Sequence, residues 1–405
     1  MEQSATPFTG YQKFVIFLLA ITLFTVVLDF MVMSPLGDLM MKSLNITTAQ
    51  FGVAVSAYAF SAGISGLLTA GFADRFDRKH LLLFFYIGFA VGTLFCALAP
   101  NYPLLVAARI LTGIFGGVIG SIAMAIVADL FTLQQRGKVM GFVQMGFGAS
   151  QVLGIPIGLY IANHWGWQMP FVWIAAMAGG IAFAIFLKMK PVTEHLALQK
   201  NQSALKHLWH TVAQSNYRLG FLSTALLSIG GFMMMPFGSA FAINNLKLTT
   251  EQLPFLFMVT GVASLVTMPF IGKLSDKVNK FKLFTVATLS AILIVNIYAH
   301  YAETPFWVVL LTNVLMMIAI MSRMVPSSAL TSAIPQPQDR GAFMSINSSL
   351  QQIAGGFGAM IAGMIIVQKD NFSPLQHYDT LALVASLMML CTIYLVYRIS
   401  LLTRS

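Results

Sequence analysis

Long apolar segments separated by short polar ones occupy most of this chain. An apolar run of about 20 residues is long enough for a helix to cross the hydrocarbon core of a bilayer. Helices are expected because a membrane barrel needs alternating strands of roughly 10 residues, and this sequence has no such series. The pattern predicts twelve spans, approximately at residues 14–36, 51–73, 80–99, 103–128, 139–162, 170–189, 219–243, 254–274, 283–301, 305–330, 343–367 and 379–401.

The predicted spans divide six and six around a polar segment. Residues 1–190 are predicted to form one bundle of six helices and residues 218–405 a second one. The cytoplasmic linker 191–217 places basic residues such as Lys200 and Lys206 among apolar ones, a pattern typical of an amphipathic helix on a membrane surface. We therefore expect an all-α polytopic membrane protein built from two linked bundles.

One sequence motif occurs twice, about half the chain apart. Residues 70–79 read AGFADRFDRK and residues 272–280 read GKLSDKVNK, and aligning Asp74 with Asp276 gives an offset of 202 positions. The chain is therefore predicted to be a duplicated six-helix unit, an organisation common among membrane transporters. Further matches occur in the same order, at 47–50 with 249–252 and at 136–140 with 340–344.

Composition and charge narrow the class of protein. The chain is 58% hydrophobic and 9% charged, whereas soluble domains carry about 25% charged residues. Its net charge of +10 can indicate nucleic-acid binding, but the lysines and arginines gather in loops on one side of the predicted spans. By the positive-inside rule that side is cytoplasmic and holds both termini, as in a multi-pass protein of a bacterial-type inner membrane. We therefore expect the bilayer as a partner, and no nucleic acid.

Nothing in the sequence indicates an enzyme, a cofactor or a metal site. Cys96 and Cys391 lie in predicted spans and have no metal-binding spacing. No nucleotide-binding motif is present, so ATP is not expected to drive this protein. A membrane-embedded enzyme would need acidic, histidine or serine groups clustered at one depth, and the seven histidines are scattered over loops and helix ends. A transporter is therefore favoured over an enzyme, and a receptor or scaffold would be distinguished by the absence of any flux.

The duplicated loop resembles the signature loop of the major facilitator superfamily, roughly G-x-L-A-D-R-x-G-R-K. The second copy fits well, and the first departs from it at Ala70 and Asp77, where glycine is usual. Aspartate tolerates unusual backbone angles, so the turn is expected to survive. The resemblance implies a major facilitator fold with 12 transmembrane helices as two pseudo-symmetric six-helix bundles. It also implies that the two loops form a conformational latch. The predicted latch residues are Asp74, Arg75, Arg78, Asp276, Lys277 and Lys280. The alternative is a basic loop that only fixes the topology.

Two further segments resemble motifs of proton-coupled exporters. Arg109 and Gly113 are similar to the helix-4 motif of proton-coupled facilitators, and the match is partial because glutamine is common one residue before that glycine. Gly154, Pro156 and Gly158 are similar to the helix-5 stretch of the drug:proton antiporter-1 group, which exports drugs and sugars, although the stricter motif has glycine directly before proline. The resemblance implies export; the alternative is close helix packing without directional meaning.

Charged residues inside predicted spans are candidates for function, because burying them in a bilayer is costly. Asp29 lies about 22 Å from the cytoplasmic start of its helix, and Arg109 lies about 9 Å from the outer end of an antiparallel one. The two therefore lie at similar depth, and we predict an Asp29–Arg109 pair that exchanges protons. A fixed structural ion pair, or a carboxylate that binds substrate without titrating, are the alternatives. Arg323 lies three residues before a proline and is predicted either to satisfy carbonyls of a broken helix or to bind an anionic substrate.

The resemblance implies a central cavity lined by helices 1, 4, 7 and 10. Methionine and phenylalanine make adaptable apolar walls for varied ligands, although most methionines of such a protein only pack. The predicted function is proton-coupled efflux of a small organic molecule by alternating access, and we expect a monomer. The alternative is a proton-coupled importer or facilitative carrier of the same fold. The predicted substrate-binding residues are Asp29, Met33, Met234, Phe237, Arg323 and Gln351.

Overall fold

The computed structural model describes residues 8–69, 72–198, 210–336 and 339–403. The described residues are almost entirely helical, and their only β-type pairing is an isolated bridge between Val367 and Gln376. Lys200 and Lys206, with most of the predicted amphipathic helix of the linker, lie outside the described residues.

The first half of the chain contains six long helical segments and several short ones. The segments α6, η2 and α7 follow one another as a single span over 134–165. The elements are α1 (Gly10–Val32), α2 (Gly37–Leu44), α3 (Thr48–Thr69), η1 (Ala73–Arg75), α4 (Arg78–Leu98), α5 (Tyr102–Leu130), α6 (Leu133–Ala149), η2 (Ser150–Gly154), α7 (Ile155–Trp165), α8 (Met169–Lys188) and η3 (Glu194–Leu198).

The second half repeats this arrangement. The segments α10, η4 and α11 form one span over 215–244, which is interrupted at Pro236 because proline cannot donate a backbone hydrogen bond. The elements are α10 (Ser215–Met234), η4 (Met235–Phe237), α11 (Gly238–Asn244), α12 (Gln252–Lys277), α13 (Lys280–Ala299), α14 (Phe306–Ser332), α15 (Arg340–Ile365) and α16 (Tyr378–Leu402).

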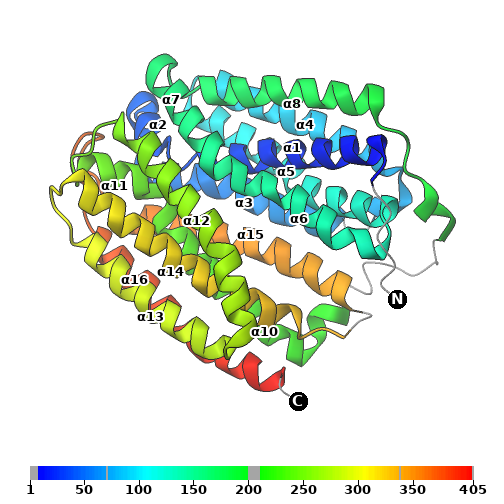
Figure 1. Ribbon diagram of the computed structural model, residues 1–405. Coiled ribbons are helices and arrows are strands. Elements are labelled where there is room, and N and C mark those ends of the chain that lie inside the picture. Colours follow the sequence, from blue (N-terminus) through cyan, green and yellow to red (C-terminus); the bar gives the residue numbers. More distant parts are fainter. Residues whose placement is uncertain (1–7, 70–71, 199–209, 337–338, 404–405) are drawn as a thin grey trace.

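Each of the twelve predicted spans corresponds to a helical segment of the structure. Eleven helices of the described residues are long and apolar enough to cross a membrane. The twelfth, α15, is 26 residues long but carries a polar run, and it packs against α3 of the first half and α10 of the second. Of its polar residues, Ser349 is buried, whereas Ser348 and Gln351 are exposed. Both chain ends lie at the same end of the molecule, and α2, α7 and α11 lie at the opposite end, called the far end below (Figure 1).

Backbone details confirm the duplication. Asn45 and Lys247 are 202 positions apart, and both adopt left-handed angles, with φ of 50° and 61°. Asp77 and Asn279, also 202 apart, both cap a following helix, because their side chains accept the backbone N–H of Lys79 and of Lys282, respectively. Asp77 has an ordinary φ of −55°, so this turn requires neither glycine nor an unusual backbone conformation.

The two halves meet along α3 with α15 and along α12 with η2 and α7. Glycines permit this approach: a Cβ on Gly52 of α3 would lie 2.8 Å from the Ala359 carbonyl oxygen of α15. Nine hydrogen bonds between described residues join the halves: eight involve residues of α2, η4, α7 and α11 or of the loops and helix ends beside them, and the ninth, Ser56 to Gly356, lies about two helical turns further in. They join Ser34 to Met235 and to Ser239, Asn244 to Asp38 and to Lys42, Asn371 to Met41 and to Asn45, Thr48 to Ile366, Ser56 to Gly356, and Asn163 to Thr250. The far end is therefore closed.

Candidate functional site

A buried ion pair lies inside the first half. Nη1 of Arg109, on α5, donates to Oδ2 of Asp29, on α1, at 2.9 Å. Both residues are fully buried. The structure therefore brings together the two charged residues that the sequence placed at similar depth.

Two other helices complete the surroundings of this pair. Thr93 of α4 donates its hydroxyl to Oδ1 of Asp29 at 3.1 Å. The ring of Tyr58, on α3, lies 4.6 Å from the guanidinium carbon of Arg109, which is within the range of a cation–π contact. Nε of Arg109 is buried and has no hydrogen-bond partner among the described residues. Both oxygens of the Asp29 carboxylate therefore accept a hydrogen bond, whereas one nitrogen of the Arg109 guanidinium has no partner among the described residues.

Glycine determines how closely these helices approach. A Cβ on Gly113 would lie 2.4 Å from the backbone oxygen of Tyr58, and a Cβ on Gly92 would lie 2.8 Å from the hydroxyl of Thr112. Any larger residue at Gly113 would push α3 away from α5 and lift the Tyr58 ring from Arg109. This close approach gives a structural reason for glycine four residues after the arginine.

The net charge of this ion pair changes by one when Asp29 takes up or releases a proton. Two opposite charges without water are stable only when their geometry and remaining hydrogen bonds are good. Protonation of Asp29 would remove the attraction that holds Arg109, and withdrawal of Arg109 would leave a carboxylate that must take up a proton or reach water. The pair is thus suited to link proton occupancy to the positions of α1, α3, α4 and α5.

The buried cation of the second half has a different environment. Arg323, on α14, is 4% exposed, and its Nε donates to the Thr288 hydroxyl at 3.1 Å. Its Nη2 lies 3.4 Å from the Thr392 hydroxyl, and its guanidinium carbon lies 5.7 Å from the ring centre of Phe284. Among the described residues, no carboxylate forms a salt bridge with it. Arg323 is therefore held by neutral partners.

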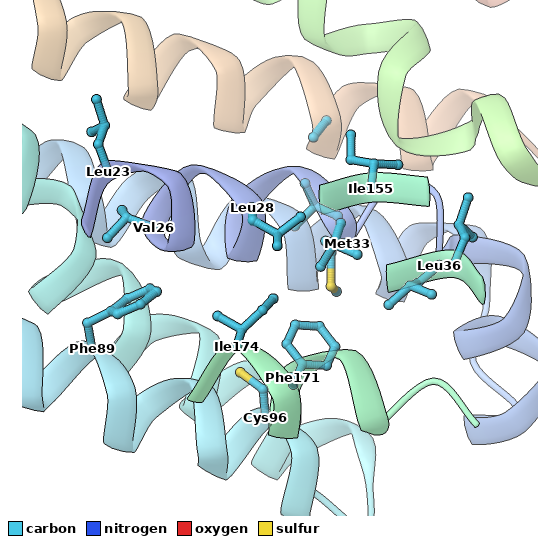
Figure 2. Packing of buried hydrophobic residues seen from close by; sticks show 14 of the residues in the cluster. Leu23, Val26, Leu28, Met33, Leu36, Phe89, Cys96, Ile155, Phe171 and Ile174 are labelled. Carbon is cyan, nitrogen blue, oxygen red and sulfur yellow. The ribbon is translucent and has the colours of Figure 1, made fainter. Parts of the chain in front are cut away.

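The predicted substrate residues do not line one pocket in this conformation. Met33 and Phe237 are buried at the closed far end, where Met33 lies among apolar side chains such as Ile155 and Phe171 (Figure 2). Met234 is half-buried, and Gln351 is exposed on α15. Asp29 and Arg323 lie inside separate halves.

The first signature loop contains a charge contact that the sequence did not reveal. Nε of Arg78 donates to Oδ2 of Asp129, at the end of α5, at 3.1 Å. Arg75 is exposed, and the side chain of Asp74 lies outside the described part of the structure. Asp129 was missed because it is 51 positions downstream and looks like an ordinary helix-end residue.

The same loop holds the start of the linker. Oδ1 of Asp77 accepts the backbone N–H of Val192 at 2.9 Å, and Nδ1 of His195 lies 3.1 Å from Oδ2 of Asp129. Partial burial raises the pKa of Asp77, but the backbone N–H groups of Val192 and Lys79 and the ring of His80 outweigh that effect and hold it below its ordinary value of 3.8.

The second signature loop is less connected. Asp276 and Lys277 are exposed near the end of α12, and Lys280 begins α13. Within the described ranges, none of these three residues takes part in a salt bridge. The two predicted latches therefore differ in this conformation, because only the first has an acidic partner on a neighbouring helix.

The helix-5 glycines face α1. A Cβ on Gly154 would lie 2.7 Å from a methyl of Leu28, and a Cβ on Gly158 would lie 3.0 Å from a methyl of Val32. Five residues, Ser150–Gly154, form a π-helical turn just before Pro156. Such turns occur often at functional sites. Here the turn packs against α12 of the second half.

Comparisons with known proteins agree with this architecture. Residues 19–359 match the family described as Major Facilitator Superfamily. The chain is 27% identical to the uncharacterized MFS-type transporter YbcL of Bacillus subtilis (strain 168), over 87% of this chain and 88% of that protein. It is 21% identical to multidrug resistance protein 2 of the same organism, over 87% of this chain and 89% of that protein. The crystal structure of a D-xylose-proton symporter has the same fold, with a TM-score of 0.75 and 18% identity over 94% of this chain and 97% of that one.

Proposed function

Because this chain belongs to the Major Facilitator Superfamily, we propose that it exports a small organic molecule in exchange for protons, with Asp29 as the proton carrier. Members of the family are membrane transporters, not enzymes, so the finer questions are the coupling ion, the direction and the substrate. The observation that carries the proton assignment is the fully buried Asp29–Arg109 pair.

A carboxylate with one charged partner offers a simple exchange cycle. When Asp29 is ionised, Arg109 neutralises it and the four helices pack around the pair. When a proton replaces the arginine as the neutralising group, Arg109 is released and the helices can shift. Exchange of substrate for protons then follows if the halves reorient only when either the proton or the substrate is bound, so that the two are carried in turn in opposite directions.

The direction of transport rests on two observations. The glycine-rich stretch of the fifth span is similar to that of exporters and packs closely against α1. A relative that spans most of the chain is named a multidrug resistance protein. With the lysine-rich loops and both termini in the cytoplasm, the closed far end faces outward, so this conformation would receive substrate from the cytoplasm. One chain is expected to suffice, since both halves and the ion pair lie within it.

The test is transport by the purified protein in liposomes, after a growth screen of an efflux-deficient bacterium has supplied a substrate. Asp29→Asn should abolish accumulation driven by an imposed pH gradient but retain exchange of labelled for unlabelled substrate. Asp379→Asn, which changes an exposed aspartate of α16, is the matched control and should behave like the unchanged protein.

Three results would overturn parts of this proposal. Full gradient-driven transport by Asp29→Asn would remove the proton role of that residue. Loss of exchange together with gradient-driven transport, in a folded variant, would assign Asp29 to substrate binding. Substrate that moves in the same direction as the protons, toward the cytoplasmic side of the protein, would indicate an importer.

A further inference from the structure

A short series of aromatic contacts connects the buried ion pair to the second half of the molecule. Tyr58 lies over Arg109, with its ring centre 4.6 Å from the guanidinium carbon. The ring of Phe30, the residue after Asp29, lies 5.2 Å from that of Tyr58. The ring centre of Phe30 also lies 5.8 Å from that of Phe232, on α10 of the second half. These distances are typical of aromatic pairs that attract each other.

Phe30 and Phe232 occupy nearly equivalent positions of the two repeats. They are 202 positions apart, and the prolines that follow them, Pro35 and Pro236, are 201 apart. Residues at nearly equivalent positions that touch must lie close to the pseudo-two-fold axis between the halves. The Phe30–Phe232 pair therefore lies at the centre of the contact between the bundles.

The pair also lies at the inner limit of the closed far end. Four residues beyond Phe30, Ser34 begins the inter-half hydrogen bonds, with Met235 and Ser239 as partners. On the α15 side, a Cβ on Gly355 would lie 3.1 Å from the Phe232 ring, so this ring is packed against the helix backbone. Opening the far end must separate Phe30 from Phe232.

Tyr58 is held so that it responds to Arg109. Its backbone is pressed against Gly113, and a Cβ on Gly116 would lie 2.8 Å from its hydroxyl oxygen. The ring therefore contacts both Arg109 and Phe30. A displacement of Arg109 removes one of the two surfaces that fix the ring.

We infer that Tyr58 is a positioning residue through which the Asp29–Arg109 pair controls an aromatic gate formed by Phe30 and Phe232. This inference rests on the proposed proton exchange at Asp29. In the paired state Arg109 holds Tyr58, Tyr58 supports Phe30, and the gate stays closed toward the far end. When Arg109 is released, either by a proton on Asp29 or by bound substrate, Phe30 loses its support and the gate can open.

The test compares Tyr58→Phe with Tyr58→Leu in liposomes over a range of pH. Tyr58→Phe keeps the ring over Arg109 and should transport like the unchanged protein. Tyr58→Leu removes the ring and should lower gradient-driven accumulation at least tenfold, while substrate exchange without a gradient falls less than threefold. Its exchange rate should also lose its dependence on pH.

Phe60→Leu is the matched control. Phe60 contacts Phe357 across the same interface, with ring centres 4.9 Å apart, but no aromatic or cation–π contact links it to Tyr58 among the described residues. This variant should keep the pH profile of the unchanged protein. Phe30→Leu and Phe232→Leu should resemble Tyr58→Leu, and combining either with Tyr58→Leu should add little further loss, because all three disrupt one pathway.

The outcomes separate this inference from the proposed function. If Asp29→Asn uncouples transport but Tyr58→Leu keeps the normal pH profile, the gate is wrong and the proton site stands. If Phe60→Leu changes the profile as much as Tyr58→Leu, the effect belongs to the interface in general and the inference fails. Should Tyr58→Leu not fold, normal coupling in Phe30→Leu and Phe232→Leu would reject the gate by itself.

Discussion

Positions that lie 202 residues apart show what the two halves share and where they differ. The first half has Asp29 where the second has the glycine pair Gly230 and Gly231, and it has Tyr58 where the second has Thr260. The backbone geometry is repeated, but the charged residue and its aromatic neighbour are not. A duplicated membrane fold can therefore keep its architecture while one copy alone holds the groups suited to proton exchange.

Arg323 does not restore the symmetry. It lies 214 positions after Arg109, so it is not the repeat counterpart of that residue. Its hydrogen-bond partners are threonine hydroxyls that themselves donate to backbone carbonyls. The second half thus buries a cation among neutral groups, whereas the first half buries a cation with its anion.

The largest expected effect follows from this difference. Arg109→Gln should lower the free energy of unfolding by about 3–5 kcal/mol, because it leaves the Asp29 carboxylate buried without a counter-ion. The double variant Asp29→Asn with Arg109→Gln should recover most of that loss. Chemical unfolding in detergent micelles measures both values.

Arg323→Gln is the matched change in the other half. It should shift the free energy of unfolding by about 1 kcal/mol or less, since it removes hydrogen bonds to neutral partners and also removes an uncompensated buried charge. A loss as large as that of Arg109→Gln would show that the two cations are equivalent for stability, and the contrast between the halves would no longer hold.

The fold was largely predictable from the sequence. Apolar runs of spanning length are a strong signal, and the repeated loop indicated the duplication independently of any helix boundary. Which prolines interrupt their spans was not predictable: Pro236 ends α10 in a 3₁₀ turn and a π turn at Ser150–Gly154 precedes Pro156, whereas Pro326 lies inside the continuous helix α14. Such interruptions depend on packing against neighbouring helices, which hydrophobicity does not encode.

Of the candidate site, the sequence could predict only the contact between charged residues, which are rare inside spans. Asp29 and Arg109 could be matched by depth because charges are scarce inside spans. Tyr58 could not, since one tyrosine among apolar residues carries no signal until the helices are packed together. The expectation of a pocket from Met33 and Phe237 came from the family resemblance, whereas this conformation buries both residues at the far end.

The second-largest expected effect concerns the hydrogen-bonded contact between the halves at the far end, to which the two halves contribute different residues. Asp38 and Lys42 come from the first half, and Asn244, the counterpart of Lys42 at the offset of 202, comes from the second. Nδ2 of Asn244 donates to Oδ1 of Asp38 at 2.6 Å, and Asp38 is buried. Asn244→Ala should weaken the closed state by about 1–3 kcal/mol, because it removes a donor from a buried carboxylate.

Labelling of Ala240→Cys with a membrane-impermeant maleimide, in a Cys391→Ser background, measures this opening, because position 240 is fully buried when the far end is closed. Asn245→Ala is the control: it removes the same side chain one position along, whose bonds go to Leu375 within the second half. Equal labelling in both variants would mean that local loosening, not the contact between halves, exposes position 240.

The smallest effect separates the two equivalent helix caps by their charge. Asp77 and Asn279 both accept backbone N–H groups at the start of a helix, but only Asp77 can titrate, and only Asp77 also holds Val192 of the linker. Because the folded structure lowers the pKa of Asp77, its contribution is present above the ordinary value of 3.8 and is lost as the pH falls through the lower folded value.

Hydrogen exchange at the Val192 amide, corrected for the intrinsic rate, should therefore show protection that decreases as the pH falls below about 4. Asp77→Asn keeps an acceptor and should reduce protection at neutral pH by about 0.3–1 kcal/mol, with no pH dependence in that window. Asn279→Asp makes the converse change and should give the Lys282 amide a protection that rises as its new carboxylate ionises. If protection of the Lys282 amide in Asn279→Asp does not depend on pH, the charge of Asp77 acts through its bond to Val192 of the linker and not through the helix cap. The two loops would then differ in function as well as in their partners.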